Sequence, residues 1–418
     1  MKGDSSRFVS HTEYVPSTLP DGEPVPTDGS LPSSAFAGTR ELGLYLHVPF
    51  CTSRCGYCDF NTYTADELGP GASRATYLDT ALAELRLAQS VLGDAVRPIS
   101  MLFVGGGTPT LLPASDFARF LEVVRAEFGI VDGAELSIES NPESVDAIGL
   151  EQLRTAGFNR ISFGMQSANT TVLKALDRKH SPGRVQHAVE EAKDAGFAHV
   201  NVDLIYGAPG ETDEQWQQSL DAALEVAPDH ISAYALIVED GTALGAQVAR
   251  GDVAVANEDV MAHRYVMADE SFSAAGMQWY EVSNWAKPGG QCQHNLGYWT
   301  SQDWWGIGPG AHSHIGGVRW WNVKHPATYA KALNAGVSPA AAREILTPEQ
   351  QVDETVLLGL RLASGLAVES LSSSGQERVA EAVTEGLLDP HAFDAGRAVL
   401  TLRGRLLADR LAVELLTN

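Results

Sequence analysis

Short β-branched or apolar runs alternate with amphipathic helical stretches six times between residues 42 and 240. The predicted strands are Leu44–Val48, Ser100–Val104, Glu135–Ser140, Arg160–Gly164, Val200–Ile205 and His230–Ala235. Strands that are joined by helices form parallel sheets. The pattern therefore predicts an α/β fold, a partial (β/α)6 barrel of TIM type, with its functional groups where the strands end.

Three cysteines follow the first predicted strand within eight residues: Cys51, Cys55 and Cys58, in the run C-T-S-R-C-G-Y-C. Thiolates at this CxxxCxxC spacing can bind three irons of a [4Fe–4S] cluster and leave the fourth iron open to a small molecule. A structural zinc site takes four ligands, so here it would have to recruit His47 or Asp59. A disulfide would need an oxidising compartment. The spacing favours the cluster, and both alternatives stay open.

Net charge and hydropathy limit the possible partners and the cellular compartment of the protein. The chain has 418 residues and a net charge of −24, with 53 acidic and 29 basic residues. Such a charge repels phosphate backbones, so we expect no nucleic-acid partner. No apolar run approaches the roughly 20 residues that span a bilayer, and the amino terminus lacks a secretory signal pattern. We therefore expect a cytoplasmic protein.

Composition also predicts domain boundaries. Residues 1–40 are rich in proline and poor in core residues, which predicts a flexible extension. Residues 41–240 form the predicted barrel. Residues 241–346 include a segment rich in aromatic residues, histidine and glycine. Residues 347–418 are expected to form a smaller mixed carboxyl-terminal region with a winged-helix-like module.

Glycines and polar residues stand where the barrel mouth is predicted. Gly105, Gly106 and Gly107 follow the second strand, and backbone without side chains lets a ligand approach and offers carbonyls to an ammonium group. Further polar groups stand at or shortly after later strand ends: Glu139, Gln166, Arg178 and Asp203. A guanidinium can pair with a carboxylate, and side-chain oxygens can accept from ribose hydroxyls. The alternative for each carboxylate is a helix cap.

These motifs resemble those of the radical S-adenosylmethionine (SAM) superfamily and, more narrowly, the oxygen-independent coproporphyrinogen III oxidase group. The similar segments are L-Y-L-H-V-P-F-C-x-x-x-C-x-Y-C-D-F-N, F-V-G-G-G-T-P-T, S-I-E-S-N-P-E, N-R-I-S-F-G-M-Q-S and V-D-L-I-Y-G-A-P-G-E-T, and the similarity covers residues 42–325 well. The resemblance implies a cluster whose open iron binds SAM. It implies SAM contacts at Tyr45, Tyr57, Gly106, Gly107, Thr108, Glu139, Gln166, Arg178 and Asp203.

Two positions distinguish the two branches of this group, which are the porphyrin oxidases and the HemW heme chaperones. The oxidases typically continue the motif as CxxxCxxCxC, whereas this chain has Phe60 at the last position. The run His294–Trp299 matches the HNxxYW motif that marks the HemW branch. An imidazole can ligate heme iron, and aromatic rings can stack on a porphyrin. By this resemblance residues 241–346 form a heme- or porphyrin-associated segment. Within it His294 is the leading heme ligand, and a packed core histidine is the alternative.

The resemblance implies a heme chaperone that binds heme, a [4Fe–4S] cluster and SAM, and passes heme to an acceptor protein such as a respiratory hemoprotein. Peripheral contact with membrane-bound acceptors and a homodimer are further expectations. Cys292, His312 and His314 are weaker ligand candidates. One alternative function is an anaerobic coproporphyrinogen III dehydrogenase, in which a deoxyadenosyl radical starts the oxidative decarboxylation of two propionates. The other is an interaction protein with a vestigial cluster.

Overall fold

The chain forms two compact units in the computed structural model, which describes residues 21–38, 40–68, 73–181 and 183–416. Within these ranges the larger unit comprises residues 21–278 and 283–346. The smaller unit comprises residues 279–282 and 347–416. Each unit has its own buried core.

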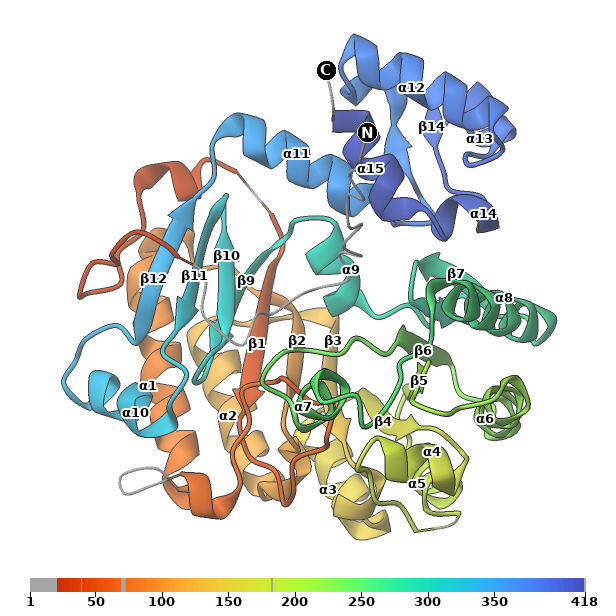
Figure 1. The fold of residues 1–418 in the computed structure, drawn as a ribbon. Coiled ribbons are helices and arrows are strands. Elements are labelled where there is room, and N and C mark those ends of the chain that lie inside the picture. The colour runs from red at the N-terminus through yellow and green to blue at the C-terminus, as the bar shows by residue number, and fades with distance from the viewer. Residues whose placement is uncertain (1–20, 39, 69–72, 182, 417–418) are drawn as a thin grey trace. The chain divides into compact units, whose positions relative to one another are not determined.

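All six predicted strands are present and lie side by side in chain order (Figure 1). They are β1 (Leu42–Val48), β2 (Ile99–Gly106), β3 (Ile130–Ser140), β4 (Arg160–Gln166), β5 (His199–Tyr206) and β6 (His230–Ala235). Every neighbouring pair is parallel, which confirms the predicted α/β partial barrel. Strands that are buried on both faces are nearly continuous in apolar residues, as the pattern of β1 shows.

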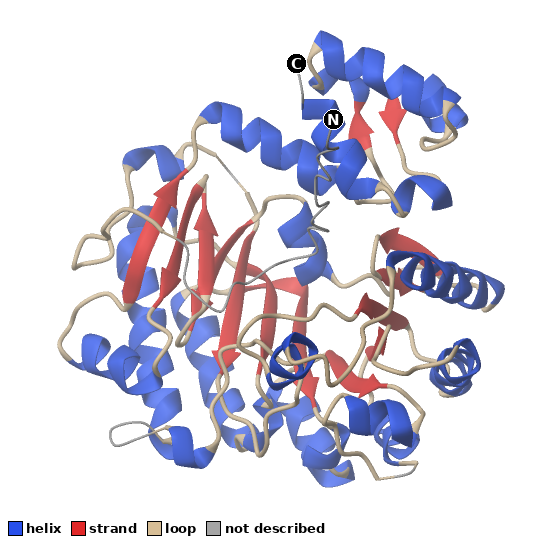
Figure 2. Cartoon of the chain, in the orientation of Figure 1, coloured by secondary structure: helices blue, strands red, loops and turns tan. Residues whose placement is uncertain are grey.

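Helices cover the outer side of these strands (Figure 2). They are α1 (Arg74–Leu92), α2 (Ala114–Glu127), α3 (Ala147–Ala156), α4 (Thr170–Ala175), α5 (Arg184–Asp194) and α6 (Asp213–Glu225). In α1 the buried positions Tyr77, Leu78, Ala81 and Leu85 follow the spacing of one helix face. Short 3-10 turns also occur: η1 (Ser33–Phe36), η2 (Ala65–Glu67), η3 (Gly93–Ala95), η4 (Pro109–Leu111), η5 (Pro142–Ser144) and η6 (Val368–Ser370).

Strands of the segment 241–346 extend the barrel sheet, which the sequence did not predict. β9 (Asp303–Ile307) pairs in parallel with β1, and β10 (His312–Ile315), β11 (Val318–Asn322) and β12 (Ala340–Ile345) continue as an antiparallel ladder. β8 (Asn284–Ala286) pairs antiparallel with β6. The helices of this segment are α7 (Ala243–Ala249), α8 (Glu258–Ala274), α9 (Gln293–Trp299) and α10 (Pro326–Asn334).

The predicted flexible extension needs correction where it is described. Residues 1–20 lie outside the described residues. Beyond them, Glu23 forms an antiparallel bridge with Arg343 of β12, and its backbone N–H lies 2.9 Å from the Arg343 carbonyl oxygen. Ala35 is buried. Backbone pairing and burial hold this part of the extension against the sheet, although its proline content is that of a linker.

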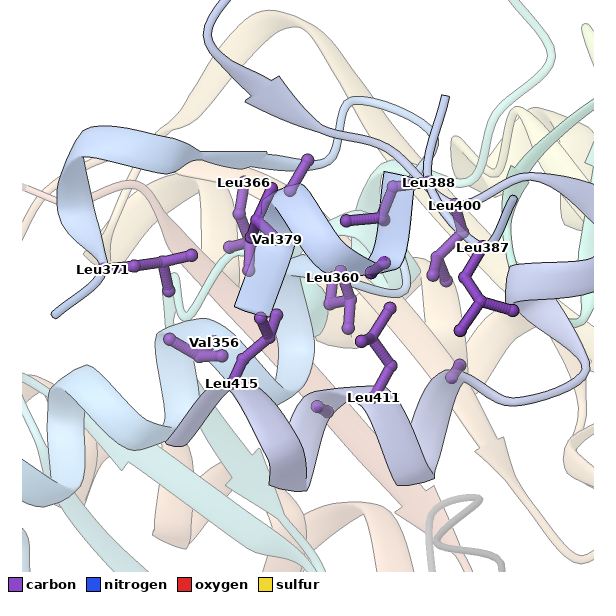
Figure 3. Close-up of a cluster of buried hydrophobic side chains, with 14 residues drawn as sticks. Val356, Leu360, Leu366, Leu371, Val379, Leu387, Leu388, Leu400, Leu411 and Leu415 are labelled. Carbon is purple, nitrogen blue, oxygen red and sulfur yellow. The ribbon is translucent and has the colours of Figure 1, made fainter. Parts of the chain in front are cut away.

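The smaller unit is built from helices around two short antiparallel strands, β13 (Leu366–Ala367) and β14 (Arg397–Ala398). Its helices are α11 (Pro348–Gly359), α12 (Ser373–Thr384), α13 (Pro390–Asp394), α14 (Leu402–Arg405) and α15 (Ala408–Leu416). Residues 279–281 of β7 (Gln278–Glu281) also belong to this unit. Figure 3 shows its core, in which Leu411 and Leu415 of α15 pack with Leu360 and Val379. The winged-helix assignment stays a prediction. Across the described residues, no helix combines the length and apolar character needed to cross a bilayer.

Candidate functional site

Three of the predicted SAM residues lie at or next to the carboxyl ends of adjacent parallel strands, whereas Tyr45 and Asp203 lie inside β1 and β5. Gly106 ends β2, Glu139 stands one residue before the end of β3, and Gln166 ends β4. Asp203 of β5 is in register with Gly164 of β4. The cysteine loop begins directly after β1. The parallel topology thus brings these groups to one edge of the sheet, as the strand pattern predicted.

Backbone hydrogen bonds fasten the cysteine loop to its neighbours. The Cys51 N–H donates to the Tyr63 carbonyl at 3.0 Å, and the Thr108 N–H donates to the Phe50 carbonyl at 2.7 Å. A Cβ atom at Gly107 would lie 2.4 Å from the Phe50 carbonyl oxygen and 3.0 Å from Cys51 Sγ. Residue 107 must therefore be glycine for the loop to lie this close to the end of β2.

The three cysteines are free and half-buried. Burial raises the pKa of the Cys51 thiol and raises that of Cys58 to about 12, so the loop needs positive charge to hold thiolates. No three His, Cys, Asp or Glu side chains of the described residues converge on a single ion. A cubane does not need such convergence, because each thiolate binds a different iron. Cys51, Cys55 and Cys58 fit such a cluster, which would supply the electron for SAM chemistry.

Arg178 brings a positive charge to this loop. Its Nη1 lies 3.4 Å from Cys55 Sγ, its Nη2 donates to the Gly164 carbonyl at 3.1 Å, and its Nε lies 3.2 Å from His180 Nε2. Close by, Gln166 has a φ of 65°. A non-glycine residue in the left-handed region is uncommon, and such strain gathers at functional sites.

Two partly buried carboxyl groups, Glu139 of β3 and Asp203 of β5, interact electrostatically. Burial, with the Asp203 charge as a second cause, raises the pKa of Glu139 to about 8. Glu139 also accepts from the Gly106 N–H at 3.1 Å. Burial raises the pKa of Asp203, which accepts from Ser162 Oγ at 2.7 Å and from Asn201 Nδ2 at 2.8 Å. Oxygens held in this way can accept hydrogen bonds from a polar ligand.

His47 and Asn61 join this site although the sequence did not single out these contacts. Tyr45 Oη lies 2.9 Å from His47 Nδ1, and His47 Nε2 lies 2.9 Å from the Asn61 carbonyl oxygen. Asn61 Nδ2 donates to the carbonyls of Pro309 and Lys324 at 2.9 and 2.8 Å. Because Pro309 and Lys324 lie about 250 residues after Asn61 in the chain, no local motif could have signalled the contacts of Asn61 with them.

His294 lies in α9, buried among aromatic rings. Its ring stacks on Phe103 with centroids 5.0 Å apart and planes at 15°, and the Tyr45 ring lies 6.2 Å away. His294 Nε2 lies 2.7 Å from Tyr298 Oη, whereas Nδ1 is buried without a hydrogen-bond partner. Burial lowers the pKa of His294 to about 4, so the imidazole is neutral. The predicted heme ligand thus lies beside the predicted SAM contact Tyr45.

The weaker ligand candidates all lie in the larger unit. His314 is hydrogen-bonded through both ring nitrogens, to the Gln302 carbonyl at 2.9 Å and to the Gly317 N–H at 3.1 Å. His312 stacks on Trp321 at 5.9 Å, and its Nε2 is buried without a partner. Cys292 is buried, and burial raises the pKa of its thiol.

Comparison with known proteins identifies the relatives of this chain. The model of the Radical SAM superfamily matches residues 45–223. Heme chaperone HemW of Mycobacterium tuberculosis (strain H37Rv) is 51% identical over 92% of this chain and 97% of the relative. Heme chaperone HemW of Lactococcus lactis subsp. lactis (strain IL1403) is 32% identical over 82% of this chain and 88% of the relative.

The solved structure of coproporphyrinogen III oxidase (HemN) from Escherichia coli shares the fold, with a TM-score of 0.77 and 24% identity over 92% of each chain. At that identity the likeness concerns the fold alone. The mycobacterial HemW, in contrast, is 51% identical to this chain, and the match covers 97% of its length. The chain therefore belongs to the HemW heme chaperone family of the radical SAM superfamily.

Proposed function

We propose that this chain binds heme through His294, holds a [4Fe–4S] cluster and SAM at the strand ends, and passes heme to an acceptor protein. The observation that carries this function is the burial of His294 of the HNxxYW motif beside Tyr45. Its neutral imidazole keeps a lone pair that can ligate iron. The 51% identity to a protein named as a heme chaperone supports the same conclusion.

The cysteine loop and α9, which carries His294, lie toward opposite ends of the barrel strands. The cysteine loop follows the carboxyl end of β1, whereas Gly297 of α9 abuts Met101 near the start of β2. Figure 1 shows α9 toward the tails of the strand arrows. The interior rings of Tyr45 and Phe103 lie between the two ends and contact the His294 ring. This arrangement supports a role of the cluster and SAM in controlling heme release.

The dehydrogenase alternative is not favoured. Phe60 occupies the position at which the oxidases carry a further cysteine, and its side chain is 56% exposed. The bacterial relatives that are 51% and 32% identical to this chain carry the chaperone name.

The proposed setting is a cytoplasmic one. No disulfide joins any of the four cysteines, as expected in a reducing compartment. The acceptor that we propose is a respiratory hemoprotein, reached by peripheral contact when it is bound to a membrane, and we propose that the chaperone works as a homodimer.

The test is a heme titration of the chain after anaerobic reconstitution of its cluster, followed by the Soret band, with a coproporphyrinogen assay in parallel. We expect heme binding that His294→Ala abolishes and that His263→Ala, a change at an exposed histidine of α8, leaves intact. We expect no vinyl product in the parallel assay. Catalytic porphyrin turnover, or full heme binding by His294→Ala, would contradict the proposed function.

A further inference from the structure

His294 cannot ligate heme in the conformation that the structure shows. The residue is 3% exposed, its ring is stacked on Phe103, and Nε2 is engaged by Tyr298. A porphyrin is a wide, flat ring system whose iron must come within bonding distance of a ring nitrogen. If His294 is the heme ligand, as the proposed function holds, ligation therefore requires an opening step that uncovers this residue.

A single carboxylate holds the start of α9 in its closed position. Glu135 of β3 accepts a hydrogen bond from Cys292 Sγ at 3.2 Å. It also accepts from the backbone N–H of Gln293 at 3.1 Å and from that of His294 at 3.2 Å. No side chain caps α9 at Cys292, so Glu135 satisfies the N–H groups that the helix start leaves open. His294 itself is thus fastened through its own backbone.

Arg160 of β4 binds both Glu135 and the residues that precede α9. Its Nε pairs with Glu135 at 2.8 Å. Its Nη2 donates to the carbonyls of Gly290 and Gln291 at 2.8 and 2.9 Å. Glu135 and Arg160 are 7% and 2% exposed. Together the two side chains bind every residue from 290 to 294, which we call the latch segment.

The barrel does not need this ion pair for its own strands. Burying two charges costs desolvation, and apolar side chains of similar volume often serve a core equally well. The hydrogen bonds of both side chains run either between the two or to the latch segment. The two charged side chains therefore serve to hold the latch segment in place.

We propose that the Glu135–Arg160 pair is a latch that holds α9, and with it His294, against the barrel strands and must release before heme can bind. When only a small fraction of a protein is open, its observed association rate is that of the open form multiplied by this fraction. Weakening the latch therefore raises the open fraction and accelerates heme ligation. Because hydrogen bonds to a charged group are the strong ones, loss of the charge should change this fraction about tenfold.

The test compares Glu135→Gln with wild type, each as the full chain with its cluster reconstituted. The matched control is Glu211→Gln, because Glu211 forms an equally buried pair with Arg264 at 2.9 Å that does not involve the latch segment. Alkylation of Cys292, quantified on its own peptide by mass spectrometry, reports opening without any heme. Stopped-flow absorbance of the Soret band reports the rate of heme association. Iron–sulfur absorbance checks that the cluster is retained.

We expect Glu135→Gln to raise both the alkylation rate of Cys292 and the heme association rate about tenfold, while Glu211→Gln raises neither. Unchanged Cys292 alkylation in Glu135→Gln would overturn the latch whatever heme does. Faster alkylation without faster heme association would also overturn it, because opening would then not limit ligation. His294→Ala separates the two claims: if that variant binds heme fully, the proposed ligand is wrong, and Cys292 alkylation still decides whether the latch exists.

Discussion

Glu84 is a carboxyl group of α1 that lies fully inside the larger unit. Burial raises its pKa to about 7, although three donors partly stabilise the charged form. They are the Gly308 N–H at 2.8 Å, Asn322 Nδ2 at 2.7 Å and Tyr329 Oη at 2.5 Å. Glu84 thus ties α1 to the later strands and to α10, and its protonation state is linked to folding.

The sign of this linkage follows from the two pKa values. The folded pKa of about 7 exceeds the ordinary value of 4.5, so between these pH values the folded chain binds more protons than the unfolded chain. The free energy of unfolding therefore falls as pH rises through this window, by about 3 kcal/mol in total. Below the window both states are protonated, and the contribution of Glu84 is fully present.

Glu84→Gln should remove this dependence, because an amide does not titrate. Urea unfolding at about pH 5 and about pH 8 should show that wild type loses about 2.5 kcal/mol more than the variant between the two conditions. Glu151→Gln, on the exposed part of α3, makes the same chemical change at the surface and should keep the wild-type slope. Equal slopes for Glu84→Gln and wild type would show that Glu84 does not titrate in this window.

Arg178 allows a second test at the scale of one side chain. Its guanidinium lies between Cys55 and the end of β4, where it can pair with the carboxylate of SAM. We expect Arg178→Gln to weaken SAM binding about tenfold, measured by equilibrium dialysis of the reconstituted chain. Lys179→Gln removes a neighbouring exposed charge and should leave SAM affinity unchanged. Loss of the cluster itself in Arg178→Gln would mean that the guanidinium holds the loop rather than SAM.

At the scale of elements, the junction of β2 with the cysteine loop depends on one glycine. Gly107→Ala would place a methyl group against the Phe50 carbonyl, and backbone atoms cannot move aside as a flexible side chain can. We expect the variant to fold but to lose most of its iron–sulfur absorbance after reconstitution, because the loop is pushed from β2. Gly149→Ala, in α3, meets only the Asp146 carboxylate at 3.3 Å and should keep the cluster. Normal absorbance for Gly107→Ala would show that the loop adapts.

The sequence predicted the elements whose partners are close along the chain. The six parallel strands follow from their alternation with helices, and the polar groups at their ends follow from parallel topology. β9 and β11 were missed because D-W-W-G-I and V-R-W-W-N lack clear alternation, and β9 pairs with β1, about 260 residues earlier. The partners of Glu84 and Glu135 were missed for the same reason. Only tertiary folding brings distant donors to these two carboxyl groups.

At the scale of the whole molecule, negative charge is spread through the chain. Acidic residues number 53 against 29 basic ones overall, and 11 against 6 within residues 347–418. The predicted winged-helix-like module therefore shares the sign of the rest of the chain. A field of that sign opposes contact with a polyanion and favours acceptors with a basic face.

This charge predicts that the module does not bind DNA, although winged helices often serve that purpose. Non-specific DNA affinity comes almost entirely from cations that replace counterions on the phosphates, and dissociation constants for such binding are about 10⁻⁴ to 10⁻⁶ M. We expect the fluorescence anisotropy of a labelled duplex to stay flat up to about 100 µM of the full chain at low salt. A basic DNA-binding protein titrated on the same duplex serves as the control. Saturable binding that weakens as salt increases would instead require a basic face on the module strong enough to overcome a net charge of −24.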